Sequence, residues 1–207
     1  MIEVLTANTP NGKKITIMLE EISYEYKIRK ININKDEQFS KEFKMLSPFS
    51  KIPVIIDHEN KISLFESGAI LMYLGEKSGK FYFEKKKHLI HQWLMGQMAY
   101  VGPMLGQHHQ FHHYNSGKSK WGEERYFKIA KDIYKDLDER LNKSEYLAGD
   151  YSIADIATFP WIARHEWHDI GLKNFKNLSR WYSTISKREA VKKGYDLLKR
   201  GETIPEV

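Results

Sequence analysis

The chain has 207 residues, of which 41% are hydrophobic and 13% aromatic, so it is not a disordered protein and is long enough for two small domains. It contains no cysteine, which excludes disulfides, thiolate metal sites and a cysteine nucleophile of the protein itself. The net charge is +6, with the excess in the second half, where we expect solvated helix faces rather than a nucleic-acid surface.

Strand and helix patterns alternate along the first 80 residues. Alternating apolar residues indicate strands, and apolar residues three and four apart indicate helices. The expected elements are strands over residues 2–6, 26–33, 53–56 and 62–65 and helices over residues 13–22, 37–46 and 66–78. A strand, a helix and a second strand imply a right-handed crossover, and a closing hairpin makes the sheet mixed. This order predicts an α/β thioredoxin-like domain over residues 1–80.

Long helical patterns replace the strands after residue 80. Helices are expected over residues 87–110, 121–142, 152–169, 174–187 and 189–200. We therefore expect an all-α domain over residues 87–207. Near the start of the helix over 152–169, Ser152 and Asp155 form a capping box, which we interpret as structural.

Neither a membrane span nor an export signal is visible in the sequence. No apolar run approaches the roughly 20 residues that a helix needs to cross a bilayer. The first residues also lack a charged stretch followed by a long apolar one. We expect a cytoplasmic protein with no membrane partner.

The first candidate site is Thr9-Pro10-Asn11-Gly12, between the first strand and the first helix. In a thioredoxin-like fold this helix end presents free N–H groups and partial positive charge, which favour a thiolate. Thr9 and Asn11 can donate hydrogen bonds to a bound thiolate but cannot form a disulfide. An ordinary helix cap explains the same residues, and on these four residues alone the cap is favoured.

Two further candidates lie where strands begin and end. Pro53 enters a strand without a ladder donor, and a cis bond after Ile52 would turn the Ile52 N–H and C=O outward, where an extended peptide could pair with them. Ser67 and the N–H groups near it can bind a carboxylate, and Glu66 can pair with an ammonium, so the two suit an amino-acid end group. The alternatives are an edge-strand proline and a second helix cap.

The combination and order of these segments resemble the glutathione S-transferase family over nearly the whole chain. Within that family the sequence is most similar to the bacterial Nu class and to the related yeast nitrogen-regulator protein. The shared stretches are TPNGKKIT (9–16), SPFSKIP (47–53), LFESGAI (64–70), GPMLGQ (102–107) and YSIADI (151–156). The resemblance implies a thioredoxin-like domain joined to a helical domain, working as a homodimer.

The resemblance also implies which residues bind glutathione. They are Thr9, Asn11, Gln38, Lys51, Ile52, Pro53, Glu66, Ser67 and, in the helical domain, Arg125, which would reach a glutathione carboxylate. Thr9 and Asn11 would lie nearest the sulfur and act in catalysis. Ile52 would hold the cysteinyl backbone, and Glu66 and Ser67 would hold the γ-glutamyl end.

The predicted activity is glutathione-dependent reduction of small disulfides, with no metal. Nu-class members resemble disulfide reductases and bind two glutathiones or glutathione disulfide, and a chain without cysteine fits a reaction in which every thiol belongs to a ligand. Thr6, Ala7 and Asn8 occupy the region where transferases commonly carry a tyrosine or serine. The alternatives are conjugation of an electrophile, reduction of an organic peroxide, and a non-catalytic glutathione-binding regulatory protein.

Four histidines lie close together in the second half: His108, His109, His112 and His113. On a helix, positions four apart share a face, and two such pairs can hold zinc or nickel. No carboxylate or cysteine is near them in the sequence. We therefore favour a polar pocket wall or adventitious metal affinity over a metal site.

Overall fold

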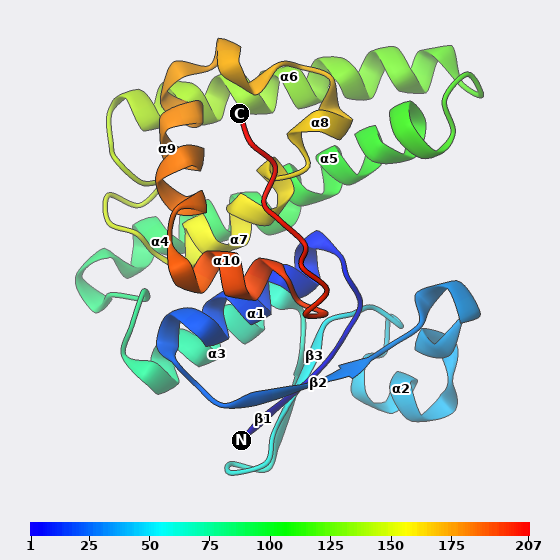
Figure 1. Cartoon of the computed structure of the whole chain (residues 1–207), viewed down its shortest axis with the longest axis vertical. Coiled ribbons are helices and arrows are strands. Elements are labelled where there is room, and N and C mark those ends of the chain that lie inside the picture. The colour runs from blue at the N-terminus through cyan, green and yellow to red at the C-terminus, as the bar shows by residue number, and fades with distance from the viewer. The chain divides into compact units, whose positions relative to one another are not determined.

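The computed structural model describes all 207 residues, and its contacts divide the chain into two compact units. The first comprises Met1–Tyr82 and Glu189–Thr203, and the second comprises Phe83–Arg188 and Ile204–Val207. The expected architecture of a thioredoxin-like domain followed by an all-helical domain is confirmed (Figure 1). No helix has the length and apolar character that crossing a membrane requires.

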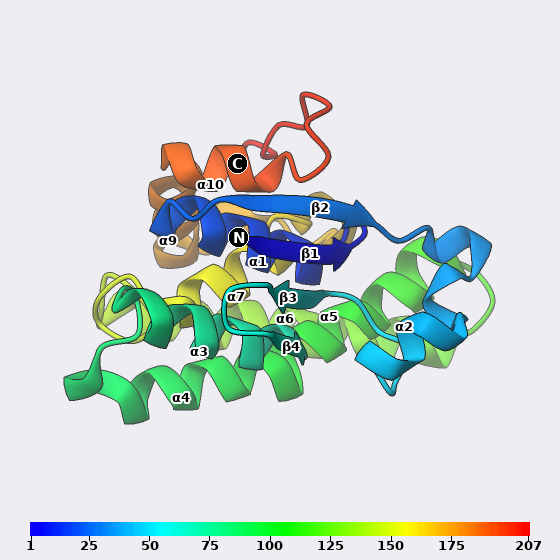
Figure 2. The same cartoon turned by 90° about the horizontal axis from the view of Figure 1, so that it is seen from below.

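A four-stranded mixed sheet forms the base of the first unit. Its strands are β1 (Ile2–Thr6), β2 (Tyr26–Lys30), β3 (Val54–Asp57) and β4 (Ile62–Phe65). Their order is β2-β1-β3-β4, with β1 parallel to β2 and antiparallel to β3 (Figure 2). Strand β2 ends three residues before the predicted boundary because Asn32 caps a 3-10 turn, its Oδ1 accepting a hydrogen bond from the Asn34 N–H at 3.2 Å.

Four helices complete the first unit: α1 (Pro10–Ile22), α2 (Lys41–Leu46), α3 (Ser67–Ser78) and α10 (Glu189–Tyr195). Helix α2 is shorter than predicted, because Ser40 caps it and a separate 3-10 turn, Glu37–Phe39, precedes the cap. Helix α10 packs on α1, although the sequence pattern places it in the helical half. Gly194 permits this approach, since a Cβ there would lie 2.4 Å from the Ile17 Cα. The predicted domain limits, 1–80 and 87–207, stay a prediction.

The second unit is built of helices, with two isolated β-bridges between residues 146 and 150. It contains α4 (Lys87–Gly96), a π-helical segment (Gln97–Val101), α5 (Gly102–His108), a second π-helical segment (His109–Tyr114), α6 (Lys120–Asn142), α7 (Ile153–Ile162), α8 (His165–His168) and α9 (Lys176–Ser186), with 3-10 turns at Glu84–Lys86 and Leu172–Asn174. The helix predicted over 87–110 is therefore interrupted by π-helical geometry, which often accompanies functional sites. The helix predicted over 152–169 ends at Ile162, and α8 follows as a separate turn.

Each unit has its own core. In the first unit, Leu5, Ile31, Phe43 and Val54 form a buried cluster beneath the end of the sheet where β1 ends and β3 begins. In the second unit the largest fully buried side chains include Tyr134, Phe159, Trp181 and Tyr182. Burial of several aromatic residues is a major source of stability for a domain of this size.

Candidate functional site

Four connecting segments of the first unit leave the sheet at the same end. The register pairs Thr6 at the end of β1 with Lys30 at the end of β2. It also places Val54, the first residue of β3, opposite Phe65, the last residue of β4, and opposite Leu5 near the end of β1. The segments that follow β1, β2 and β4 and the segment that precedes β3 therefore gather there, and these segments carry the candidate residues of the first unit.

Helix α1 begins at this end, capped by Thr9. The Thr9 Oγ1 accepts a hydrogen bond from the Gly12 N–H at 3.2 Å, so the hydroxyl retains its own proton as a donor. Asn11 lies half-buried in the same first turn, which contains no acidic residue. This turn packs closely against the end of β1. Gly12 permits the approach, since a Cβ at that position would lie 2.4 Å from the Thr6 Oγ1. The first turn of α1 thus offers donors and partial positive charge to a thiolate.

The segment before β3 is held by Ser47. Its Oγ donates to the Lys51 C=O at 2.8 Å and accepts from the Lys51 N–H at 3.1 Å. The Ile52–Pro53 peptide bond is cis. No hydrogen bond in the structure uses the backbone N–H or C=O of Ile52. One backbone donor and one acceptor therefore remain at this position for an extended ligand.

Helix α3 begins at this end without a side-chain cap. Its N-cap residue, Glu66, is exposed and makes no capping hydrogen bond. The Glu66 backbone has a φ of 68°, in the left-handed region where a non-glycine residue is strained. Ser67 and Gly68 follow and are buried. The first N–H groups of α3 can therefore receive a carboxylate, while the Glu66 side chain is placed to meet a cation.

A buried lysine of α1, which sequence reasoning missed, contacts the start of α3. The Lys14 Nζ donates a hydrogen bond to the Ser67 Oγ at 3.2 Å, and the Lys14 side chain is 1% exposed. Burial lowers the pKa of Lys14 to about 7, and the Glu66 carboxylate opposes that shift. A signal was present in the sequence: Lys14 stands three and four residues before Ile17 and Met18, on the apolar face of α1.

Gln38 lies in the segment that follows β2, within the 3-10 turn Glu37–Phe39. Its Nε2 lies within 3.5 Å of the Ile33 carbonyl oxygen and of the Asp36 Oδ1. Its Oε1 is buried and has no hydrogen-bond partner. An amide oxygen left in that state is available to a donor from a ligand.

Arg125, the remaining candidate, belongs to the second unit. It is exposed on α6, and its guanidinium lies 5.4 Å from the centre of the Trp121 ring, in cation–π range. Its approach to a ligand of the first unit stays a prediction.

Two of the four clustered histidines, His108 and His109, take part in a buried polar network with His168 and Tyr134. The Tyr134 hydroxyl lies 2.6 Å from the His168 Nδ1, and the His168 Nε2 lies 2.8 Å from the His109 Nε2. His108 bonds through Nε2 to the His168 carbonyl at 2.9 Å, and its ring stacks on that of His112. Burial holds the pKa of His168 well below its usual value. No group of three or more His, Cys, Asp or Glu side chains is placed to hold a metal ion.

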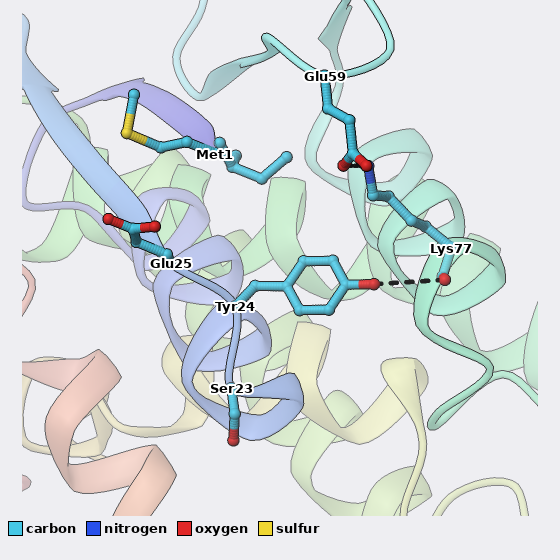
Figure 3. Close-up of a pocket in the computed structure, with 7 residues that line it drawn as sticks. Met1, Ser23, Tyr24, Glu25, Glu59 and Lys77 are labelled. Atoms are coloured by element: carbon cyan, nitrogen blue, oxygen red, sulfur yellow. Dashed lines mark hydrogen bonds and ion pairs between the residues drawn. The ribbon is translucent and has the colours of Figure 1, made fainter.

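A surface depression of about 460 Å³ lies at the opposite end of the sheet, where β1 begins. It is lined by Met1, Ile2, Ser23, Tyr24, Glu25, Glu59 and Lys77 (Figure 3). Its polar groups bond to one another: the Tyr24 hydroxyl donates to the Lys77 C=O at 3.3 Å, and the Lys77 Nζ lies 2.8 Å from a Glu59 carboxylate oxygen. This depression contains none of the predicted site residues.

The sequence matches two family profiles. Residues 4–76 match the glutathione S-transferase N-terminal domain, and residues 107–189 match the glutathione S-transferase C-terminal domain. Among curated proteins, the disulfide-bond oxidoreductase YfcG of Escherichia coli (strain K12) is 41% identical over 207 residues, covering 96% of this chain and 95% of YfcG.

Solved structures of glutathione transferases have the same fold. One, from Pseudomonas putida, with one glutathione disulfide bound per subunit, is 38% identical with a TM-score of 0.87, over 95% of this chain and 91% of that one. Another, from Burkholderia graminis, with two glutathione molecules bound per subunit, is 36% identical with a TM-score of 0.90, over 97% of this chain and 89% of that one.

Proposed function

Because the chain belongs to the glutathione S-transferase family, we propose that it is an enzyme that reduces disulfides with glutathione and without a cysteine of its own. The observation that carries this proposal is the gathering of the Thr9, Ile52 and Glu66 segments at one end of one sheet. The relatives support it, since YfcG is named a disulfide-bond oxidoreductase and the Pseudomonas and Burkholderia enzymes hold glutathione disulfide or two glutathiones.

The proposed site accommodates glutathione along its length. The Glu66 carboxylate pairs with the γ-glutamyl ammonium, and the Ser67 hydroxyl, with the first N–H groups of α3, binds the γ-glutamyl carboxylate. The Ile52 backbone pairs with the cysteinyl residue. The cysteinyl sulfur then lies beside Thr9 and Asn11, whose side chains and helix start stabilise a thiolate.

The remaining predicted residues contribute at the edge of this site. The Gln38 Oε1 accepts a hydrogen bond from the ligand, and the exposed Lys51 attracts a carboxylate. Pro53 fixes the segment that presents Ile52. Arg125 binds a glutathione carboxylate from the helical unit.

The chemistry requires two glutathiones. The first thiolate attacks one sulfur of the substrate disulfide, which forms a mixed disulfide and releases the other sulfur as a thiolate that takes up a proton. The second glutathione thiolate attacks the glutathione sulfur of the mixed disulfide, which forms glutathione disulfide and releases the second substrate thiol. Each turnover oxidises two glutathiones and reduces one disulfide. The protein stabilises and orients the thiolates.

We also propose that the protein is a homodimer of the cytoplasm. Two apolar side chains of the first unit are unusually exposed, Met45 at 82% and Phe49 at 69%, and such residues suit a protein–protein interface. The cytoplasm supplies the reduced glutathione that the reaction consumes. Analytical ultracentrifugation of wild-type protein and of Phe49→Asp tests the dimer: we expect a dimer that the substitution weakens.

The activity is tested by comparing three substrate classes with glutathione as co-substrate: a small disulfide, an electrophile and an organic hydroperoxide. We expect the highest kcat/KM for the disulfide, measured by coupling the product to glutathione reductase. A disulfide rate no higher than the uncatalysed rate would rule the proposal out. Preference for one of the other substrates would favour a transferase or a peroxidase. Glutathione binding without turnover of any substrate would indicate a regulatory protein.

Two substitutions test the roles of the proposed catalytic residues. Thr9→Ala and Asn11→Ala each remove a donor to the thiolate, and we expect each to lower kcat/KM by about tenfold or more. Thr9→Ser is the matched control, because serine keeps both the hydroxyl and the helix cap. Activity of Thr9→Ala equal to that of Thr9→Ser would contradict the assignment.

A further inference from the structure

The chain beyond α10 returns to the start of α1 within the first unit. Helix α10 is fixed on α1, where the Thr16 Oγ1 donates a hydrogen bond to the Gly194 C=O at 2.6 Å. The Asp196 carboxylate then accepts hydrogen bonds from the Arg200 N–H and the Gly201 N–H, each at 2.8 Å. These bonds close the residues after α10 into a turn, which is therefore an ordered part of the first unit.

The carboxylate of Glu202, directly after this turn, joins two residues at the start of α1. The Asn8 Nδ2 donates a hydrogen bond to one of its oxygens at 2.9 Å, and the Lys13 ammonium forms an ion pair with the other. The Lys13 side chain is 1% exposed and that of Glu202 is 30% exposed. Because a carboxylate only accepts, the Asn8 amide must present its nitrogen to Glu202. One side chain near the end of the chain thus bridges Asn8 and Lys13.

The two bridged residues bracket Thr9. Asn8 precedes it in the chain, and the Lys13 backbone N–H donates a hydrogen bond to the Thr9 C=O at 3.0 Å. The Thr9 N–H in turn donates to the Ala7 C=O at 2.8 Å. A carboxylate that holds Asn8 and Lys13 together therefore restricts the backbone on both sides of the Thr9 side chain.

We propose that Glu202 is a positioning residue for Thr9: by holding the residues on either side, its carboxylate keeps the Thr9 hydroxyl where it donates to the glutathione thiolate. This role rests on the proposed function, in which Thr9 stabilises the thiolate. Glu202 acts through Thr9 and makes no bond to the ligand. Position matters here, because a displacement of about 1 Å in a site can cost about a hundredfold in rate.

The charge of Glu202 acts in the opposite direction from its position. A carboxylate near a thiolate disfavours the thiolate, and the Lys13 ammonium offsets this effect. Loss of the carboxylate charge alone would therefore favour the thiolate and speed the reaction, whereas loss of position slows it. A slower reaction after removal of the Glu202 carboxylate consequently reports position.

Substitution of Glu202 separates the effect on rate from the effect on binding. Disulfide reduction is measured with saturating glutathione at a pH above which the rate no longer rises, so that thiol ionisation does not limit it. We expect Glu202→Ala to lower kcat about fivefold or more and to leave the affinity for S-methylglutathione, which has no thiol, within about twofold. Glu206→Ala is the control, since Glu206 is exposed near the end of the chain, and it should change neither quantity.

Two further comparisons test whether Glu202 acts through its contacts. In a Thr9→Ala background, Glu202→Ala should have little further effect on kcat, because the hydroxyl that it positions is absent. Asn8→Asp sets two carboxylates against each other and should slow the reaction. Adding Glu202→Gln to Asn8→Asp should recover much of the lost rate, because the new amide donates to the new carboxylate and still accepts from Lys13. Circular dichroism confirms that each variant is folded.

The outcomes distinguish the role of Glu202 from the function on which it rests. Wild-type protein that reduces a small disulfide no faster than the uncatalysed rate would remove the proposed function and this role with it. An active wild type would overturn the role of Glu202 alone if Glu202→Ala left kcat unchanged, lowered affinity and kcat together, or kept its full effect without the Thr9 hydroxyl. If Glu202→Ala does not fold, the Asn8→Asp pair decides, and a rate that Glu202→Gln does not recover would contradict the role.

Discussion

The helices α7 and α3 both begin with a serine and an acidic residue, but they use them differently. At the start of α7, the Asp155 carboxylate accepts hydrogen bonds from the Leu147 N–H at 3.0 Å, from the Ser152 N–H at 3.1 Å and hydroxyl at 3.2 Å, and from the Trp181 Nε1–H at 2.8 Å. The Ser152 hydroxyl accepts from the Ala154 N–H. The start of α7 is thus satisfied by the chain itself.

At the start of α3, the acidic side chain is exposed instead. Glu66 has a left-handed backbone and makes no capping hydrogen bond, and Ser67 is held by the buried Lys14. Strain and a desolvated cation both cost folding free energy. The difference separates two kinds of helix start: the start of α7 is closed by its own residues, whereas the start of α3 carries an exposed charge and is the one that we propose binds a ligand.

Asp155→Ala should break the closed start of α7 and have the largest effect on stability. The substitution leaves several buried donors without an acceptor, and we expect a loss of about 3–5 kcal/mol in the free energy of unfolding. Urea denaturation measures it. Asp150→Ala is the control, since Asp150 is 60% exposed in a surface ion pair with Lys86 and should cost less than about 1 kcal/mol. Equal effects of the two substitutions would contradict the structural role of Asp155.

Lys14→Met should move stability in the opposite direction. Replacing a buried cation by an apolar side chain of similar length should raise the free energy of unfolding at pH 7, by up to about 4 kcal/mol. The pKa of Lys14 falls from its ordinary value of 10.5 to about 7 in the folded protein. The unfolded chain therefore binds more protons between these values, and wild-type stability rises with pH across that window. Urea denaturation from pH 7 to pH 10 should show this rise, and Lys14→Met should lack the part due to residue 14.

Glu66→Gln should weaken glutathione binding and leave stability unchanged, unlike the substitution of Asp155 at the start of α7. The glutamine keeps the size of the side chain and removes the charge that meets the ligand ammonium. We expect affinity for glutathione to fall by about 1.5–3 kcal/mol, measured by calorimetry, and the free energy of unfolding to change by less than about 0.5 kcal/mol. A large loss of stability with unchanged affinity would place Glu66 with Asp155 as a structural residue.

Removal of metal ions should have the smallest effect. The histidines near His168 bond to one another and to Tyr134, and they do not form a group placed for a metal. Dialysis against a chelator should leave both the melting temperature and the disulfide reductase activity unchanged. A loss of either that zinc restores would show that a metal contributes.

The sequence predicts the parts of this protein that depend on local pattern. The order of the strands and helices in the first unit and the capping box of Ser152 and Asp155 follow from periodicity and spacing. Lys14 and His168 are different, because their roles depend on partners far along the chain, Ser67 and His109. A lysine in an amphipathic helix is ordinarily solvated, so the place of Lys14 on the apolar face of α1 is too weak a signal to predict its burial.

The candidate site could be predicted from the sequence only in part. Thr9, Ile52 and Glu66 each fit an ordinary cap or edge when considered alone, and their order along the chain suggested one site. The register of β1, β3 and β4 explains why the segments that carry them leave the sheet at the same end. Helix α10 could not be placed from its own pattern, because its packing on α1 depends on the small size of Gly194.

The central claim is that the first N–H groups of α3 bind a ligand carboxylate. The most direct test is to titrate the protein with glutathione disulfide and follow the backbone amides by NMR. We predict that the amide signals of Ser67 and Gly68 shift as the ligand binds, because their N–H groups receive its carboxylate, while those of Ala154 and Asp155 stay where they are. Saturating ligand that leaves the Ser67 and Gly68 signals unmoved would contradict the account.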